Sequence, residues 1–145
     1  MPTISTLELL ETNGYAAISG VLSHEQVQQV TQEISNIEHT AASTRKMLDL
    51  PWCGKLADTL GSDPRLNPAL PLDARAVQCT LFVKTVENNW LVSLHQDLSI
   101  PVADRIESPH CSGWSYKEGD LFVQPPITTL QDIVAVRLHL DDCDD

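Results

Sequence analysis

The sequence has few basic residues and no long apolar run. Nine Lys and Arg stand against twenty Asp and Glu, which gives a net charge of −11. Such a surface repels phosphate backbones and anionic lipid, so we expect neither nucleic-acid nor membrane binding. No apolar run exceeds four residues, as in Ile133–Val136, whereas a membrane helix needs about 20. Residues 1–15 lack the basic and apolar regions of a signal peptide, so we expect a cytoplasmic protein.

Cysteine pairs with metal-binding spacing are also missing. The four cysteines lie far apart and form no Cys-x-x-Cys motif: Cys53, Cys79, Cys111 and Cys143. In a cytoplasmic protein this pattern predicts reduced, mostly structural thiols, and nothing in it supports a zinc site. What remains is ordinary for a globular chain, with 42% hydrophobic residues and a mean hydropathy of −0.11. A length of 145 residues predicts one domain with a real core.

Helix signals dominate residues 1–75. A short helix is expected at Thr6–Glu11, because Asn13 and Gly14 form a typical C-terminal stop. Ser23 and Gln26 form a capping box before an amphipathic pattern, which predicts a surface helix. Pro51 suits the first turn of a third helix that ends at Gly61. Its inward face is predicted to consist of Trp52, Leu56 and Leu60.

Strand signals dominate residues 76–145. Alternating or β-branched patterns predict strands at Ala76–Val86, Trp90–His95, Leu121–Val123 and Ile133–Leu140, with a weaker β signal at Tyr15–Ile18. Loops rich in Pro and Gly connect them. Helices followed by strands indicate an α+β fold, a single domain over residues 1–145.

The most informative short motif is His95-Gln96-Asp97. In a strand, residues i and i+2 point to the same face, so the His95 imidazole and the Asp97 carboxylate could converge on one metal ion. Two such ligands are the first members of a 2-His-1-carboxylate facial triad. His-x-Asp also occurs often by chance, and a plain hydrogen-bonded pair is the alternative.

Several segments together carry a likeness to a known family. They are Gly14-Tyr15 to Val21-Leu22-Ser23 with the helix that follows, Val77–Phe82, Asn88-Asn89-Trp90, His95–Ile100, Gly113–Gly119 and Val134–Asp142. In these segments the chain resembles the phytanoyl-CoA dioxygenase family, most specifically around His95-Gln96-Asp97. The resemblance implies N-terminal helices packed on a partial double-stranded β-helix, a jelly-roll or cupin-like sheet. It also implies oxygenation that depends on Fe(II) and 2-oxoglutarate, with O2 as the other cosubstrate and His95 and Asp97 as iron ligands.

The chain departs from the family pattern at its end. Members continue into further strands, a distal histidine that completes the triad and an arginine for 2-oxoglutarate. No position here matches either residue, so we expect an incomplete domain and little or no oxygenase activity from this chain alone. His139 is a substitute ligand only in principle, since an ordinary sheet histidine is the better interpretation. The last predicted strand would leave an open sheet edge, which predicts self-association.

Other candidate residues are less specific. Lys84 could hold a carboxylate of the cosubstrate, or be a solvated lysine at a strand end. Trp114 and Tyr116 lie in a predicted loop and could form a lid over the iron, or simply pack under that loop. Arg105 and Lys117 are candidate contacts for a substrate carboxylate. The small number of cations favours a small organic substrate over a CoA thioester. Two alternatives stay open: a catalytically silent fragment with a binding or vestigial role, and a cupin-like protein that uses another metal.

Overall fold

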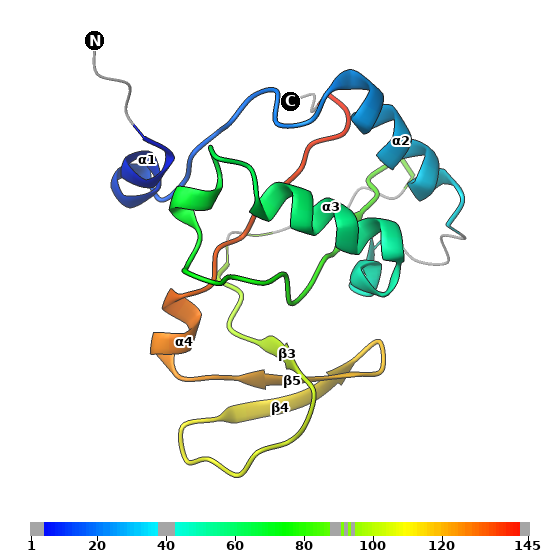
Figure 1. Cartoon of the computed structure of the whole chain (residues 1–145). Coiled ribbons are helices and arrows are strands. Elements are labelled where there is room, and N and C mark those ends of the chain that lie inside the picture. Colours follow the sequence, from blue (N-terminus) through cyan, green and yellow to red (C-terminus); the bar gives the residue numbers. More distant parts are fainter. Residues whose placement is uncertain (1–4, 38–42, 88–90, 92, 94, 143–145) are drawn as a thin grey trace. The chain divides into compact units, whose positions relative to one another are not determined.

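A computed structural model describes residues 5–37, 43–87, 91, 93 and 95–142 (Figure 1). The chain forms two compact units. One consists of the described parts of Met1–Glu38, Lys55–Arg75 and Val134–Asp145, and the other of the described parts of His39–Gly54 and Ala76–Ile133. The elements in chain order are α1 (Thr6–Asn13), α2 (His24–Ser35), β1 (Ser43–Thr44), the 3-10 turn η1 (Met47–Asp49), α3 (Pro51–Gly61), the 3-10 turn η2 (Asn67–Ala69), β2 (Leu81–Phe82), β3 (Ile100–Val102), β4 (Ser112–Lys117), β5 (Asp120–Gln124) and α4 (Ile127–Gln131).

Capping residues set the boundaries of the first two helices. The N-caps Ser5 and Ser23 each form a full capping box with the residue three positions later, which satisfies main-chain N–H groups that the first turn leaves unpaired. Helix α1 ends at Gly14, whose φ of 79° is left-handed and whose N–H donates to the Leu10 carbonyl at 2.8 Å. The predicted helix and its stop at Asn13-Gly14 are therefore confirmed.

Helix α3 also has its predicted bounds, because Pro51 begins it and Gly61 ends it. Its best-buried side chain is Cys53, which is 3% exposed. Three larger side chains of this helix are half-buried: Trp52, Leu56 and Leu60. No helix in the described chain is both long enough and apolar enough to span a bilayer.

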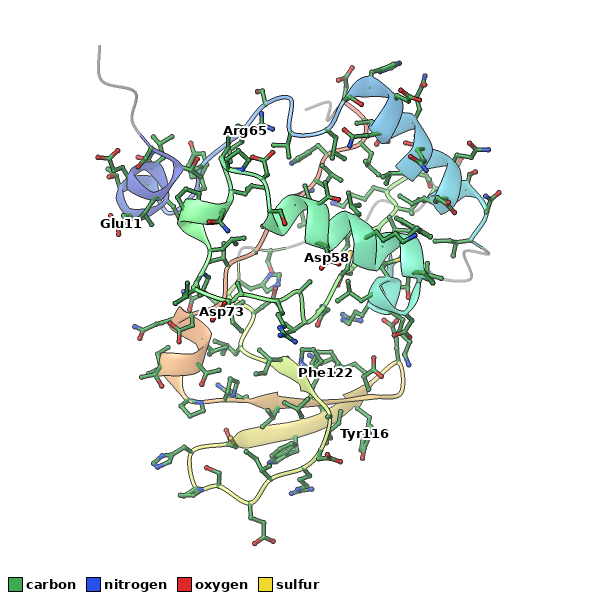
Figure 2. The ribbon with its side chains drawn as sticks, viewed as in Figure 1. Glu11, Asp58, Arg65, Asp73, Tyr116 and Phe122 are labelled. Carbon is green, nitrogen blue, oxygen red and sulfur yellow. The ribbon has the colours of Figure 1, made fainter. Side chains whose placement is uncertain are left out.

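A three-stranded antiparallel sheet organises the second unit, with β5 between β3 and β4. The register pairs Pro101 with Phe122 on one side and Ser115 with Phe122 on the other. Strand β5 has a paired strand along each of its edges. Its residues Phe122 and Val123 are each only 2% exposed, so they form the core of this unit. Figure 2 labels Phe122 beside the sheet ribbon. A register shift between Ser112 and Ser115 marks a β-bulge in β4.

Two long strand predictions are wrong. Within Ala76–Val86 only Leu81–Phe82 forms a strand, paired with β1, and Cys79 adds one isolated bridge to Lys46. Residues 133–140 contain no strand. Alternating side chains favour a strand but do not supply the partner whose N–H and C=O groups must complete the ladder. Without a partner, apolar side chains stay in solvent, as Val86 does at 96% exposure.

Other parts of the β pattern differ as well. Tyr15–Ile18 forms no strand, and the predicted strand Trp90–His95 lies partly outside the described residues; its described members 91, 93 and 95 have no regular structure. The predicted strand at Leu121–Val123 is confirmed within β5. Strand β4 was expected to be a loop, because it contains Gly113 and two serines. The fold therefore mixes helices with a small antiparallel sheet, and the jelly-roll arrangement stays a prediction.

Candidate metal centre

The His95 side chain has a defined hydrogen-bonding state. Its Nδ1 lies 2.7 Å from the main-chain carbonyl oxygen of Ser93. A carbonyl oxygen can only accept, so Nδ1 carries the hydrogen, and in the neutral ring this tautomer has its lone pair on Nε2. A hydrogen bond from the other ring nitrogen to a carbonyl is the usual way in which proteins orient a metal-binding histidine. In that tautomer, Nε2 is the ring nitrogen that could bind a metal ion.

Asp97 places its carboxylate beside that nitrogen. Its Oδ1 lies 3.6 Å from Nε2 of His95. Two ligands that each bind about 2 Å from one metal ion are at most about 4 Å apart, so the pair fits a shared ion. The residues lie together although neither is in a strand. Two intervening peptide units keep side chains at i and i+2 close, and the bond to Ser93 turns the imidazole.

The pair is open to solvent. The side chain of His95 is 55% exposed and that of Asp97 is 95% exposed. Among the described residues, no group of three or more His, Cys, Asp or Glu side chains is arranged to hold a metal ion. The residues present thus fit two ligands, and the remaining positions on an ion would be open to water or small molecules.

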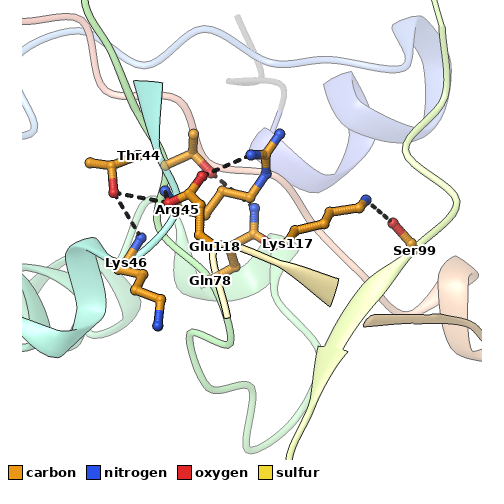
Figure 3. A network of polar contacts seen from close by, with 8 residues as sticks. Thr44, Arg45, Lys46, Gln78, Ser99, Lys117 and Glu118 are labelled. Carbon is orange, nitrogen blue, oxygen red and sulfur yellow. Dashed lines mark hydrogen bonds and ion pairs between the residues drawn. The ribbon is translucent and has the colours of Figure 1, made fainter. Parts of the chain in front are cut away.

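The segment that carries the pair leads directly into the sheet. Ser99 precedes β3, whose first residue, Ile100, pairs with Val123 of β5. Lys117, the last residue of β4, donates from Nζ to Ser99 Oγ at 2.7 Å, as Figure 3 shows. The same ammonium group lies 4.7 Å from the centre of the Phe122 ring, which is close enough for a cation–π interaction.

Of the other residues predicted from the sequence, Lys84, Arg105 and Trp114 belong to the second unit. Lys84 is exposed and lies two residues beyond β2. Trp114 lies in β4 rather than in the expected loop, because β4 pairs with β5. The Arg105 guanidinium stacks over the Trp114 ring, 5.2 Å from its centre. His139 belongs to the first unit and is exposed.

Arg105 also borders a shallow hollow beside the β4–β5 hairpin. Tyr116 lines the same hollow, together with the acidic side chains of Asp104 and Asp120. Tyr116 is 75% exposed, and Figure 2 labels it near the hairpin. The sequence pointed to Tyr116 as a lid residue in a loop, whereas the structure places it in strand β4.

A cluster of charged side chains fixes the turn of the same hairpin. Glu118 has a left-handed backbone with φ of 53°, and its carboxylate accepts hydrogen bonds from Thr44 Oγ1 at 3.1 Å and from the Arg45 main-chain N–H at 2.9 Å. The Arg45 guanidinium adds a 2.9 Å ion pair (Figure 3). The bond from the Arg45 N–H is the main reason why the pKa of Glu118 is below its usual value. Lys46 reaches Asp120 at 3.2 Å, so β1 is tied to the hairpin at two points.

The comparison with protein families identifies the class of the chain. The family model described as phytanoyl-CoA dioxygenase (PhyH) matches residues 10–145. The chain therefore belongs to the phytanoyl-CoA dioxygenase family, which confirms the resemblance found in the sequence. Members of this family typically use Fe(II) and 2-oxoglutarate. No match was found among curated proteins or solved structures.

Proposed function

We propose that His95 and Asp97 supply two protein ligands to Fe(II) in an oxygenase that consumes 2-oxoglutarate and O2 and acts on a small organic substrate. The observation that supports this is the 3.6 Å approach of Nε2 to Oδ1, together with the hydrogen bond from Nδ1 to Ser93, which in the neutral ring puts the lone pair on Nε2. Family membership supports the choice of iron and of 2-oxoglutarate.

Each protein group has a distinct task in this proposal. The Ser93 carbonyl selects the histidine tautomer, and Asp97 contributes a negative charge that attracts a cation. When bound, Fe(II) supplies the capacity to react with O2 while 2-oxoglutarate is converted to succinate and CO2. Because both side chains are exposed, water exclusion around the pair requires groups beyond these two residues.

We assign Arg105 as a candidate contact for a substrate carboxylate. Stacking on Trp114 restricts the guanidinium plane, and its N–H groups at the rim can still donate to an anion. Arg105 is the basic residue in the lining of the hollow, where the Tyr116 hydroxyl could also donate, whereas Asp104 and Asp120 in the same lining would oppose an anion. Lys84 stays a candidate for the cosubstrate carboxylate on the basis of charge alone.

The decisive experiment measures metal binding. Anaerobic titration with Fe(II), and with Co(II) as a spectroscopic substitute, should show binding by the unaltered chain. We expect His95→Ala and Asp97→Asn each to weaken it by at least about tenfold. Two matched controls should bind as the unaltered chain does: His110→Ala, an exposed histidine, and Asp132→Asn, an exposed aspartate. Equal affinity in all four variants would remove the metal assignment.

Succinate formation tests the reaction class separately. Purified chain is loaded with Fe(II) without oxygen, and succinate is quantified after 2-oxoglutarate and O2 are added. Any metal-dependent succinate should disappear in His95→Ala. Metal-dependent turnover that survives in this variant would show that the reacting ion lies elsewhere.

A further inference from the structure

The contact between Lys117 and Ser99 joins the candidate metal segment to the core of the sheet. Lys117 Nζ donates to Ser99 Oγ at 2.7 Å, and both residues are partly buried. Ser99 lies only two residues after Asp97. Figure 3 shows the lysine reaching from the end of its strand to the serine on the neighbouring segment. This is a link of 18 residues in sequence that fixes the chain just beyond the carboxylate ligand.

The lysine is itself held in place. Its main chain pairs with Asp120 in the β4–β5 hairpin, and its ammonium group lies over the ring of Phe122, 4.7 Å from the centre. Phe122 is 2% exposed and belongs to the central strand. Because Ile100 pairs with Val123 in the same strand, Ser99 is fixed by the sheet on its C-terminal side and by Lys117 at its side chain.

Residues 95–99, by contrast, have no regular secondary structure. The direction of the Asp97 carboxylate therefore depends on how firmly its neighbours in sequence are held. Ser93 orients the imidazole from one side of the pair. On the C-terminal side of Asp97, Lys117 donates a hydrogen bond to Ser99, which lies two residues further along the chain.

We propose that Lys117 is a positioning residue for the metal pair, which acts by holding Ser99 and so fixing the backbone that carries Asp97. This inference rests on the proposed role of His95 and Asp97. It differs from the substrate contact predicted for Lys117 from sequence, because the ammonium group already interacts with a hydroxyl and an aromatic ring. Direct hydrogen-bond partners of a metal ligand typically change metal affinity by 10–100-fold, and a contact that acts through the backbone should fall at the lower end of that range.

The test is Co(II) titration followed by visible absorption, applied to Lys117→Met and Ser99→Ala. The methionine keeps an unbranched apolar side chain and removes the ammonium group. We expect each variant to bind Co(II) about tenfold more weakly and to give a changed absorption band. The double variant should be no weaker than either single one, since both remove the same contact. Lys117→Arg, which keeps a donor, should recover part of the affinity.

Controls separate this role from loss of fold and from failure of the metal site. Lys55→Met removes an exposed lysine from α3 and should leave binding unchanged. Circular dichroism should show the same helix and sheet content in every variant. If Lys117→Met does not fold, the smaller change Ser99→Ala still tests the contact. Unaltered binding in Lys117→Met and Ser99→Ala, with binding lost in His95→Ala, overturns the positioning role alone. Unaltered binding in His95→Ala as well overturns the metal site itself.

Discussion

The side chains of Asp63 and Arg65 bind each other as a two-pronged ion pair. Asp63 Oδ2 lies 2.7 Å from Nη2 and Oδ1 lies 3.0 Å from Nε. The second terminal nitrogen of Arg65 donates to the carbonyls of Ser19 and Gly20, at 3.2 Å each. An aspartate that orients an arginine thus connects the turn after α3 to the loop before α2, within the first unit.

Replacement of Asp63 by asparagine should therefore loosen this connection. The hydrogen bonds from Arg65 lower the pKa of Asp63 to about 2, from an ordinary value of 3.8. A carboxyl group with a lowered pKa stabilises the fold above its unfolded pKa and loses that effect as it becomes protonated. Stability should fall as the pH falls from about 4 to about 2, and Asp63→Asn should flatten this part of the curve.

Urea denaturation at several pH values checks this prediction. Asp58→Asn, at an exposed position on α3, is the matched control and should keep the acid dependence of the unaltered chain. An unchanged slope between pH 4 and pH 2 in Asp63→Asn would contradict the assignment.

Glu118→Gln should weaken the attachment of β1 to the hairpin. The change removes the charge that pairs with Arg45 but keeps an oxygen that can accept from the Arg45 N–H. Since both side chains are about one-third exposed, the cost should be about 1 kcal/mol or less. A double-mutant cycle with Arg45→Met measures the coupling. Glu107→Gln, at an exposed loop position, should have no effect, and zero coupling between positions 118 and 45 would refute the pair.

Cys53 should be the least reactive of the described thiols. Burial, with a smaller contribution from Cys79, raises its pKa to about 12, and the thiol reacts as the thiolate. At pH 8, alkylation by iodoacetamide should modify the half-buried Cys111 well before Cys53. Peptide mass spectrometry follows each site, and in urea all four cysteines should react alike. Equal rates at Cys53 and Cys111 in the folded chain would be evidence against this.

The same raised pKa predicts a loss of stability in alkali. The folded state keeps the Cys53 proton at pH values where the unfolded chain releases it, so stability should decline as the pH rises above about 9. Cys53→Ala removes this titration and should reduce the slope between pH 9 and pH 11. Cys111→Ala serves as the control, and its slope should match that of the unaltered chain.

The N-cap of α2 should contribute measurably to stability. Ser23 accepts from the Gln26 N–H at 3.2 Å, and the Gln26 side chain accepts from the Ser23 N–H at 2.8 Å. Ser23→Ala leaves a first-turn N–H without its partner, which should cost about 1 kcal/mol. Thermal unfolding followed by circular dichroism measures this cost. Ser62→Ala, at an exposed serine after α3, should leave the midpoint unchanged, and a similar shift in both variants would argue against a specific cap.

The helices could be predicted because their signals are local. A capping serine, a first-turn proline and a left-handed Gly14 act within a few residues of the boundary that they set. The strands could not be predicted equally well, since pairing depends on distant segments. The alternation in residues 133–140 suggested a strand that the structure lacks, and the glycine and serines of β4 concealed one that pairs with β5.

In the candidate site, too, local features could be predicted from the sequence and long-range contacts could not. The closeness of His95 and Asp97 could be anticipated from their spacing, although the strand invoked for it is absent from residues 95–97. Neither the hydrogen bond to the Ser93 carbonyl nor the contact of Lys117 with Ser99 could be foreseen, although Lys117 itself was predicted as a substrate contact. The carbonyl is a main-chain group without a sequence signature, and the lysine reaches Ser99 only after the β4–β5 hairpin forms.

The outer strands β3 and β4 of the three-stranded sheet determine whether another chain could add a strand to its edges. Pro101 in β3 has no N–H to offer to an added strand, and the bulge near Gly113 interrupts the regular spacing of β4. Both features make a strand a poor template for further strands. The edges of the three-stranded sheet are therefore protected against the templated addition of strands by which fibres grow.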